Sequence, residues 1–201
     1  MGLQRIDVYT DKRFSQKALY QHGCFLVDKM PFEVEIISEF EAIIRGNNVD
    51  AYTKVINEFR FYTPHITKFY NKDGQLVKEY PQVQLLTIYL DQIQPSQFFV
   101  DKDKIAAIRT FIQEPEDIIV QVLPYEGRYI SLDGHTRLYF AVMKGWNYVR
   151  AMIESSDQGI YNFVKEAKRR GIYTPKDMTL VCHKEYEVKW NRFCDEFFAD
   201  A

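Results

Sequence analysis

Residues 133–137 have the sequence Asp-Gly-His-Thr-Arg and stand between an apolar, strand-like run and the start of a helical pattern. The first amides of a helix have no partner inside it, and the helix dipole adds partial positive charge there. Gly134 leaves room for close approach, and Arg137 brings a forked donor that matches phosphate oxygens. His135 can add a donor, neutral or charged, and Thr136 adds a hydroxyl. The turn therefore carries the donors of a phosphate site.

Asp133 allows two incompatible interpretations. In a phosphate site its carboxylate would hold Mg2+ or take a proton from an attacking hydroxyl. Aspartate is also among the best N-cap residues, and a carboxylate that accepts from the next amides occupies the donors that an anion needs. Asp-Gly before a helix is more often a cap, whereas the combination with His135 and Arg137 is rarer. The direction of the Asp133 carboxylate decides between the two.

The composition is that of an ordinary globular protein and disfavours several classes. The 201 residues are 46% hydrophobic and carry a net charge of -2. Charges of both signs are spread evenly, so nucleic-acid binding is unfavoured although not excluded. No apolar run approaches the roughly 20 residues that a membrane helix needs, and the first residues lack the apolar centre of a secretion signal. We expect a cytoplasmic protein without membrane contact.

Three other groups of reactive residues have plainer explanations. A solvated face and a capping acid explain four glutamates that alternate with apolar residues: Glu33, Glu35, Glu39 and Glu41. An amphipathic helix with reduced thiols, rather than a metal site, explains the widely spaced cysteines and one histidine: Cys24, Cys182, His183 and Cys194. The dipole at a helix C-terminus explains a basic cluster: Lys165, Lys168, Arg169 and Arg170.

Residues 1–84 mix helical and strand patterns. We expect helices over 13–22 and 50–61 and strands over 24–28 and 32–37. Ser38, with Glu41 three residues on, forms a capping-box pattern, which predicts a further helix that ends at Gly46. The sequence NKDG separates two alternating runs near residue 72 and predicts a hairpin.

From residue 85 the pattern alternates strands with helices. We expect strands over 85–93, 118–123, 129–132 and 146–153, with helices over 101–113, begun by Asp101 as N-cap, and 134–144. The remainder is mostly helical, beginning with an amphipathic helix over 159–170. A later helix carries a stripe that we expect to pack on the core: Tyr186, Trp190, Phe193, Cys194 and Phe197.

Residues 85–155 resemble the ParB/sulfiredoxin superfamily. The resemblance rests on the segment IQPSQ, a helix, the strand DIIVQVL, a turn, a strand that ends in DGHTR, a second helix and GWNYVRAMI. Members of the superfamily bind nucleotide phosphates at this strand-to-helix turn, and residues 134–137 fit the GxxR motif of its partition proteins. The form DGHxR is closest to the free-serine kinase branch, which transfers a phosphoryl group from a nucleotide to a small hydroxyl compound.

The resemblance implies site residues and cofactors. ATP or ADP would be held by Gly134, His135, Thr136 and Arg137, and Mg2+ would be the cofactor, with Asp133 as its ligand or as the catalytic base. The serine-kinase branch also supplies a catalytic glutamate from the region after the first strand, where this chain has Asp101 and Asp103. Either could stand in, with Asp101 as the candidate, although both are also natural first-turn residues of a helix. A carboxylate there that faces Asp133 would favour an enzyme, and one that points to solvent would favour a binding module.

Two differences from the superfamily argue against sulfiredoxin chemistry and against a partition protein. Sulfiredoxin chemistry needs a cysteine in the turn, where this chain has His135. Partition proteins continue into a helix-turn-helix, whereas the second helix expected within 156–201 is acidic and poorly placed against phosphates.

We therefore predict an α+β protein in three segments. An N-terminal α/β segment with a hairpin covers 1–84, a ParB/sulfiredoxin-like nucleotide-binding domain with a mixed sheet covers 85–155, and a C-terminal helical extension covers 156–201. The predicted function is nucleotide binding with phosphoryl transfer from ATP or ADP to a small-molecule acceptor, as in a kinase. The alternative is a nucleotide-responsive module without turnover, associated with DNA or a protein partner.

Overall fold

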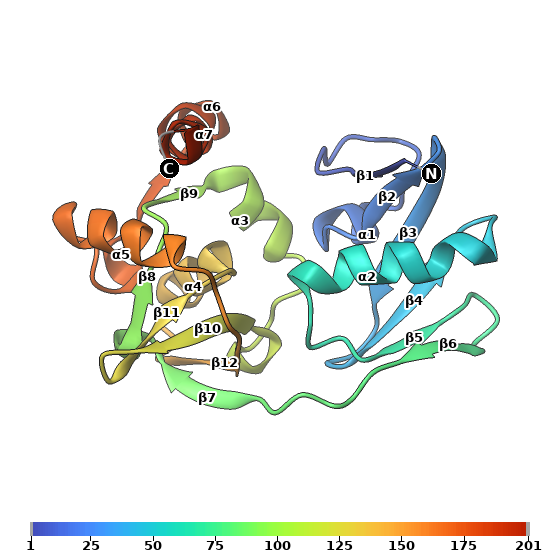
Figure 1. Ribbon diagram of the computed structural model, residues 1–201, viewed down its shortest axis with the longest axis horizontal. Helices are drawn as coiled ribbons and strands as arrows, with labels where there is room; N and C mark the ends of the chain where they lie inside the picture. Colours follow the sequence, from blue (N-terminus) through green and yellow to red (C-terminus); the bar gives the residue numbers. More distant parts are fainter. Residues whose placement is uncertain (1, 200–201) are drawn as a thin grey trace. The chain divides into compact units, whose positions relative to one another are not determined.

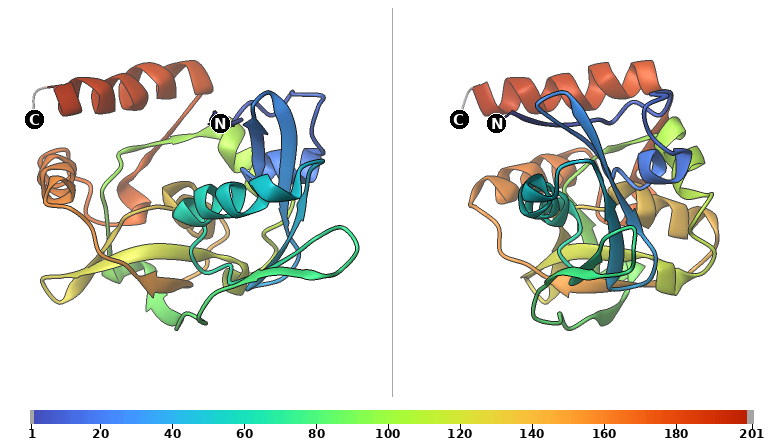
Figure 2. Two further views of the ribbon diagram at one scale, coloured as in Figure 1. Left: turned by 45° about the vertical axis from the view of Figure 1, so that its right-hand side comes forward. Right: turned by 90° about the vertical axis from the view of Figure 1, so that its right-hand side faces the viewer.

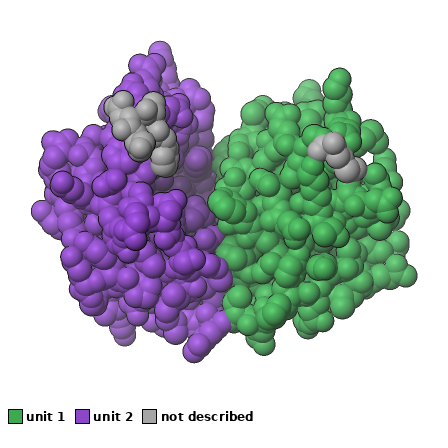
Figure 3. Space-filling view, viewed as in Figure 1, with its two compact units in different colours: residues 1–83 green, residues 84–201 purple. Residues whose placement is uncertain are grey.

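The computed structural model describes residues 2–199 and has an α+β fold of mixed sheets and helices (Figure 1). The chain divides into two compact units, residues 1–83 and residues 84–201 (Figure 3). The division falls one residue before the expected one. The expected C-terminal extension is not a separate body, since it belongs to the second unit.

The first unit is built on a six-stranded sheet. Its strands lie in the order of the sequence: β1 (Leu3–Arg5), β2 (Cys24–Val27), β3 (Met30–Ile36), β4 (Glu41–Arg45), β5 (Lys68–Tyr70) and β6 (Leu76–Glu79). Neighbours are antiparallel except β4 and β5, which are parallel and joined by the short turn Val49–Ala51 and helix α2 (Tyr52–Tyr62). Helix α2 buries Val55, Ile56 and Phe59 against the sheet. The hairpin expected around residue 72 is confirmed as β5 and β6.

The helix expected between Ser38 and Gly46 is wrong, because this segment forms β4. Its residues pair with β3 in antiparallel register, with Ile44 opposite Val34. Ala42 and Ile44 are fully buried, as the two-residue period of a strand requires. The Ser38 hydroxyl does donate to Glu41 (3.2 Å), yet this contact closes a turn between two strands instead of capping a helix.

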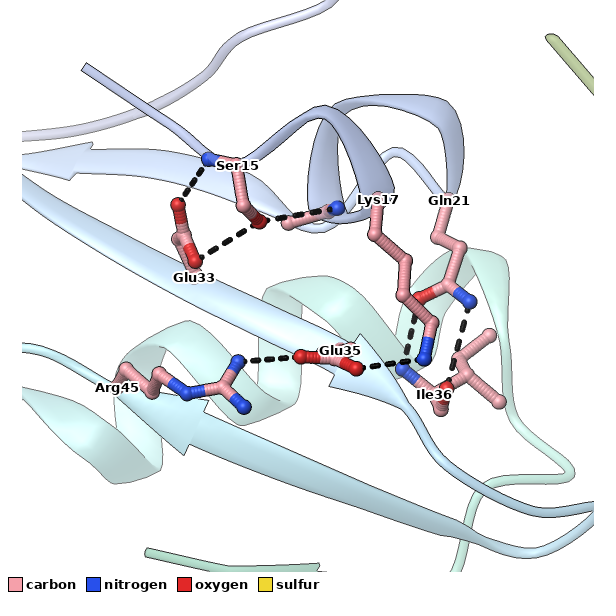
Figure 4. Close-up of polar contacts among 8 residues, drawn as sticks. Ser15, Lys17, Gln21, Glu33, Glu35, Ile36 and Arg45 are labelled. Atoms are coloured by element: carbon pink, nitrogen blue, oxygen red, sulfur yellow. Dashed lines mark hydrogen bonds and ion pairs between the residues drawn. The ribbon is translucent and has the colours of Figure 1, made fainter. Parts of the chain in front are cut away.

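Two of the alternating glutamates attach helix α1 (Gln16–Tyr20) to the sheet (Figure 4). Glu33 accepts from the amide (2.5 Å) and the hydroxyl (3.1 Å) of Ser15, which itself caps α1. Glu35 accepts from Lys17 and Arg45, each at 2.6 Å, and its side chain is 17% exposed. The expected solvated face is therefore a partly buried polar contact at these two positions.

The second unit contains a mixed five-stranded sheet. Its spatial order is β7 (Leu86–Tyr89), β12 (Tyr148–Ile153), β10 (Ile119–Tyr125), β11 (Arg128–Ser131) and β8 (Ile93–Pro95). The single strand expected over 85–93 is wrong, since a turn at Leu90–Gln92 divides it into β7 and β8. These two strands form opposite edges of the sheet.

Helices and a second, two-stranded sheet complete this unit. The helices are α3 (Lys102–Ile108), α4 (His135–Met143), α5 (Gly159–Arg169), α6 (His183–Tyr186) and α7 (Arg192–Ala199), with short turns at Pro115–Asp117 and Pro175–Asp177. A π-helical turn, Glu187–Asn191, joins α6 to α7, and the three form one continuous rod (Figure 2). The small sheet pairs β9 (Phe99–Asp101) with β13 (Thr179–Val181) in parallel, and neither strand was expected.

Aromatic side chains hold the C-terminal rod on the unit. Trp190 and Phe193 pack against the fully buried ring of Phe98, with ring centroids 5.1 and 5.2 Å away. Phe163 of α5 contacts the same two rings. The expectation that this stripe packs on the core is confirmed.

Candidate functional site

The Asp133–Arg137 turn joins β11 to α4. Gly134 begins the helix with φ +84°, and a Cβ atom there would lie 2.6 Å from a Val120 methyl group, so only glycine fits. The amide of Leu138 donates to the Gly134 carbonyl (2.9 Å). The amides of residues 135–137 thus precede the first intrahelical bond of α4.

Asp133 is paired with an arginine of this helix. Its Oδ2 accepts from Arg137 Nη2 at 2.9 Å, and the N-cap residue Gly134 has no side chain that could cap the helix. Arg137 Nη1 also donates to the Ile119 carbonyl (2.5 Å), which fixes the guanidinium between strand β10 and the turn. The Asp133 carboxylate is half-exposed and that guanidinium is 21% exposed. The Asp133–Arg137 ion pair therefore lies at the start of α4.

His135 lies beneath the turn. The ring is 6% exposed, and its Nε2 is 3.2 Å from the Ser96 amide and 2.9 Å from the Ser131 hydroxyl. An amide can only donate, so Nε2 accepts and the neutral ring carries its proton on Nδ1. Burial lowers the pKa of His135 to about 4. At neutral pH it is an uncharged residue that supports the turn, with one donor at Nδ1. Thr136 lies partly exposed beside it.

Asp101 neither faces solvent nor presents an open carboxylate. The side chain is 1% exposed, and one oxygen accepts from the Asp103 amide (2.9 Å), which confirms the expected N-cap of α3. The other oxygen accepts from Nδ1 of His183 at 2.7 Å. Neither of the two expected arrangements is present, since the carboxylate is buried against a histidine from the C-terminal rod.

Parallel pairing of β9 with β13 assembles this Asp101–His183 pair. Val181 lies opposite Asp101 in the register, and His183 follows two residues later at the start of α6. The imidazole is 55% exposed, and its Nε2 is 3.5 Å from Glu187. The hydrogen bond that His183 donates to Asp101 raises the pKa of His183.

Tyr186 lies one helical turn after His183 in α6. Its hydroxyl is buried and accepts from the Gln97 side chain at 3.3 Å. Burial raises the pKa of Tyr186, and the charges of both Asp101 and Asp133 raise it further. The ammonium group of Lys104 lies 4.8 Å from the centre of the same ring. Strand β9, which ends at Asp101, packs against both α6 and α4, so the Asp101–His183 pair lies beside the helix that follows the turn.

Asp101, Asp103 and His183 are close enough to bind a metal ion, since their ligand atoms lie within 4.8 Å of one another. Two of these atoms already share a short hydrogen bond, so we treat the group as an acid–base pair. Asp133 belongs to no such group of three within residues 2–199. Mg2+ in nucleotide sites is commonly held by one or two carboxylates together with substrate phosphates, and a single Asp133 fits that pattern.

Sequence patterns alone missed two members of this site, His183 and Tyr186. The available signal was the apolar Thr179–Val181 segment after a Pro-containing turn, which is a strand. Pairing it with residues 99–101 would have placed His183 near Asp101.

Comparisons with known proteins identify no family. No protein-family model matches the sequence, and neither does any curated protein. One similar solved structure is the crystal structure of protein Atu1540 from Agrobacterium tumefaciens, at 20% identity and a TM-score of 0.35. The match covers 48% of this chain and 61% of that chain. A similarity this low carries no argument about function. Across residues 2–199, every helix is too short or too polar to cross a membrane.

Proposed function

We propose that residues 84–201 bind nucleotide phosphates at the Asp133–Arg137 turn and transfer a phosphoryl group, with Mg2+, from ATP or ADP to a small hydroxyl compound. The observation that carries the proposal is the position of Asp133. Its carboxylate accepts from Arg137 at 2.9 Å and so holds the guanidinium at the first turn of α4, where an anion is favoured.

The turn offers a phosphate several donors in fixed positions. The amides of residues 135–137 point along the helix axis, where the dipole favours negative charge. Arg137 uses two of its N–H groups on Ile119 and Asp133, and a guanidinium has five, so further donors remain in a fixed orientation. Gly134 lets Arg137 pack closely over the turn, since a Cβ atom there would lie 3.1 Å from Arg137 Nη2.

The resemblance to the ParB/sulfiredoxin superfamily suggests which reaction would follow nucleotide binding. The DGHxR form belongs to the kinase branch that phosphorylates a free amino acid on its hydroxyl. In phosphoryl transfer, positioning and charge neutralisation supply most of the catalysis. Asp133 would hold Mg2+, and Arg137 would neutralise charge on the transferred group.

Nucleotide titration tests the binding step. ATP, ADP and CTP are titrated by calorimetry, with and without Mg2+, into wild-type protein, Arg137→Ala and Arg109→Ala. Arg109 is an exposed arginine after α3 and serves as a charge-matched control. Loss of charge-assisted hydrogen bonds worth about 1.5–3 kcal/mol should weaken binding about 10- to 100-fold in Arg137→Ala alone. Equal affinities in all three proteins, or binding by none, would remove the site.

One observation favours the alternative, a nucleotide-responsive module without turnover. Both oxygens of Asp101 are engaged, so the residue expected to replace the catalytic glutamate cannot itself take a proton from a substrate. Product analysis with Mg-ATP and L-serine separates the two functions. Bound but unchanged ATP would select the module.

A further inference from the structure

We infer that His183, oriented by Asp101, is the general base that activates the acceptor hydroxyl in the proposed transfer. The inference rests on that proposed function and adds a catalytic residue from the C-terminal part of the chain. It also assigns Asp101 a positioning role, acting through the imidazole.

The geometry of the Asp101–His183 pair carries the inference. Asp101 is 1% exposed and held at both oxygens, so it orients a partner and does not reach a substrate. Its bond to Nδ1 fixes the ring and places the proton of the neutral form on that atom. The basic lone pair is then on Nε2, on a side chain that is 55% exposed. A buried carboxylate behind an exposed imidazole is the arrangement of an oriented general base.

The charged groups around His183 favour proton uptake. Asp101 and Asp103 face it from the start of α3, and Glu187 faces it from the next turn of its own rod. All three are carboxylates, and together they raise the pKa of the imidazole. Glu187 lies 3.5 Å from Nε2, where it stabilises the ring once that atom is protonated.

Tyr186 and strand β9 lie next to this base. Tyr186 follows His183 by three residues, so the two side chains project from one face of the rod. The charges of both Asp101 and Asp133 act on its hydroxyl. Strand β9, which ends at Asp101, packs against both α6 and α4, so the Asp101–His183 pair adjoins the helix that begins at the phosphate turn.

The proposed step conserves atoms and charge. The acceptor oxygen attacks the terminal phosphorus of ATP and forms a P–O bond, while the bond from that phosphorus to the bridging oxygen breaks. The electron pair of the broken bond stays with ADP. The acceptor proton passes to Nε2 of His183, and the imidazolium then releases it to solvent.

The test combines binding, turnover and pH profile. Transfer is measured with Mg-ATP and L-serine, and ATP hydrolysis is measured without serine, in wild type, His183→Gln, Asp101→Asn and Lys184→Gln. Lys184 is exposed on the same helix and serves as the control. We expect His183→Gln to keep ATP affinity within about twofold and to lose about 100-fold or more in kcat. The ascending limb of kcat/KM against pH should vanish in His183→Gln and move to lower pH in Asp101→Asn. Lys184→Gln should match wild type.

The outcomes separate the two proposals. If ATP binds with Arg137 dependence but His183→Gln keeps the wild-type kcat and pH profile, the general base is wrong and the phosphate site stands. If ATP binds without turnover in any protein, the general base is again wrong and the module is selected. If ATP does not bind, the proposed function fails, and the inference fails with it. His183→Gln decides alone if Asp101→Asn does not fold, because His183 is half-exposed and its replacement leaves the core intact.

Discussion

Acidification should destabilise the second unit through the buried His135. An unfolded chain protonates this ring near pH 6.5, whereas the folded protein resists protonation until about pH 4. The unfolded state therefore binds more protons in this interval, and stability falls as the pH decreases. The stability that the neutral His135 ring contributes is fully present above pH 6.5 and is lost by pH 4. A difference of about 2.5 pH units corresponds to about 3 kcal/mol in the free energy of unfolding.

Urea unfolding monitored by tryptophan fluorescence measures this effect in the right unit. The two tryptophans of the chain, Trp146 and Trp190, both lie in the second unit. Measurements at pH 7, 5.5 and 4 in EDTA compare wild type with His135→Gln, whose side-chain oxygen can still accept from Ser96 but does not titrate. The variant should lose about 3 kcal/mol less than wild type between pH 7 and pH 4.

A second histidine provides a control of opposite sign. His183 has a raised pKa, so its contribution is present at low pH and is lost as the pH rises through that pKa. His183→Gln should therefore lose more stability than wild type on acidification. A constant difference between wild type and His135→Gln from pH 7 to pH 4 would refute the account of His135 as a buried, neutral ring.

Three further substitutions test packing and polar contacts. Gly134→Ala should lower the free energy of unfolding by about 2 kcal/mol or more, because the residue has a positive φ and its new Cβ atom would lie 2.6 Å from Val120. Gly127→Ala is the control, since Gly127 has a similar φ in open space, and it should cost about 1 kcal/mol. Equal losses in the two variants would contradict the packing argument. Glu35→Ala should lower the free energy of unfolding by about 1–2 kcal/mol, because Lys17 and Arg45 lose their common partner. The pKa of Glu35 is lowered in the folded protein, so the difference in stability between wild type and variant should shrink as the pH falls through that pKa. Hydrogen exchange of the β3 amides measures this difference, and a difference that does not depend on pH would count against the ion pairs. Phe98→Ala should lower the free energy of unfolding by about 3–5 kcal/mol and make the C-terminal rod sensitive to proteolysis. Phe61→Ala is the control, since this ring is 74% exposed, and it should change stability by less than about 0.5 kcal/mol. A rod that resists proteolysis in Phe98→Ala would show that other contacts hold it.

Patterns set by neighbouring residues predicted most elements of the fold. The Asp101 cap depends on an amide two residues away, and the hairpin at β5–β6 depends on four consecutive turn residues. Such features can be seen in a short window of sequence because the interacting groups are close in the chain.

Segments with two locally acceptable structures were predicted wrongly. The contact between Ser38 and Glu41 satisfies a capping pattern and also closes a turn, and residues 41–45 have apolar positions that suit either period. Pairing with β3, whose register is not visible in the sequence, selects the strand. Residues 85–93 likewise form one apolar run, and only the tertiary structure divides them between two sheet edges.

Only part of the candidate site could be predicted from the sequence, because the rest depends on tertiary pairing. Asp133 to Arg137 are consecutive, so their shared turn could be anticipated. Asp101 and His183 are 82 residues apart and meet through a three-residue strand pairing. Nothing near either residue indicates the other.

The same pairing has a consequence for biosynthesis. A ribosome makes the chain from its N-terminus, and domains fold as their residues emerge. Until residues 179–183 have been synthesised, the Asp101 carboxylate has no imidazole partner. Closing the loop between Asp101 and His183 costs conformational entropy, which only the finished contacts offset. The nascent protein can complete its five-stranded sheet and the Asp133–Arg137 turn by residue 153, well before the Asp101–His183 pair exists. The growing chain thus forms the Asp133–Arg137 turn before the Asp101–His183 pair, and under the proposed function it would bind nucleotide before it could transfer a phosphoryl group.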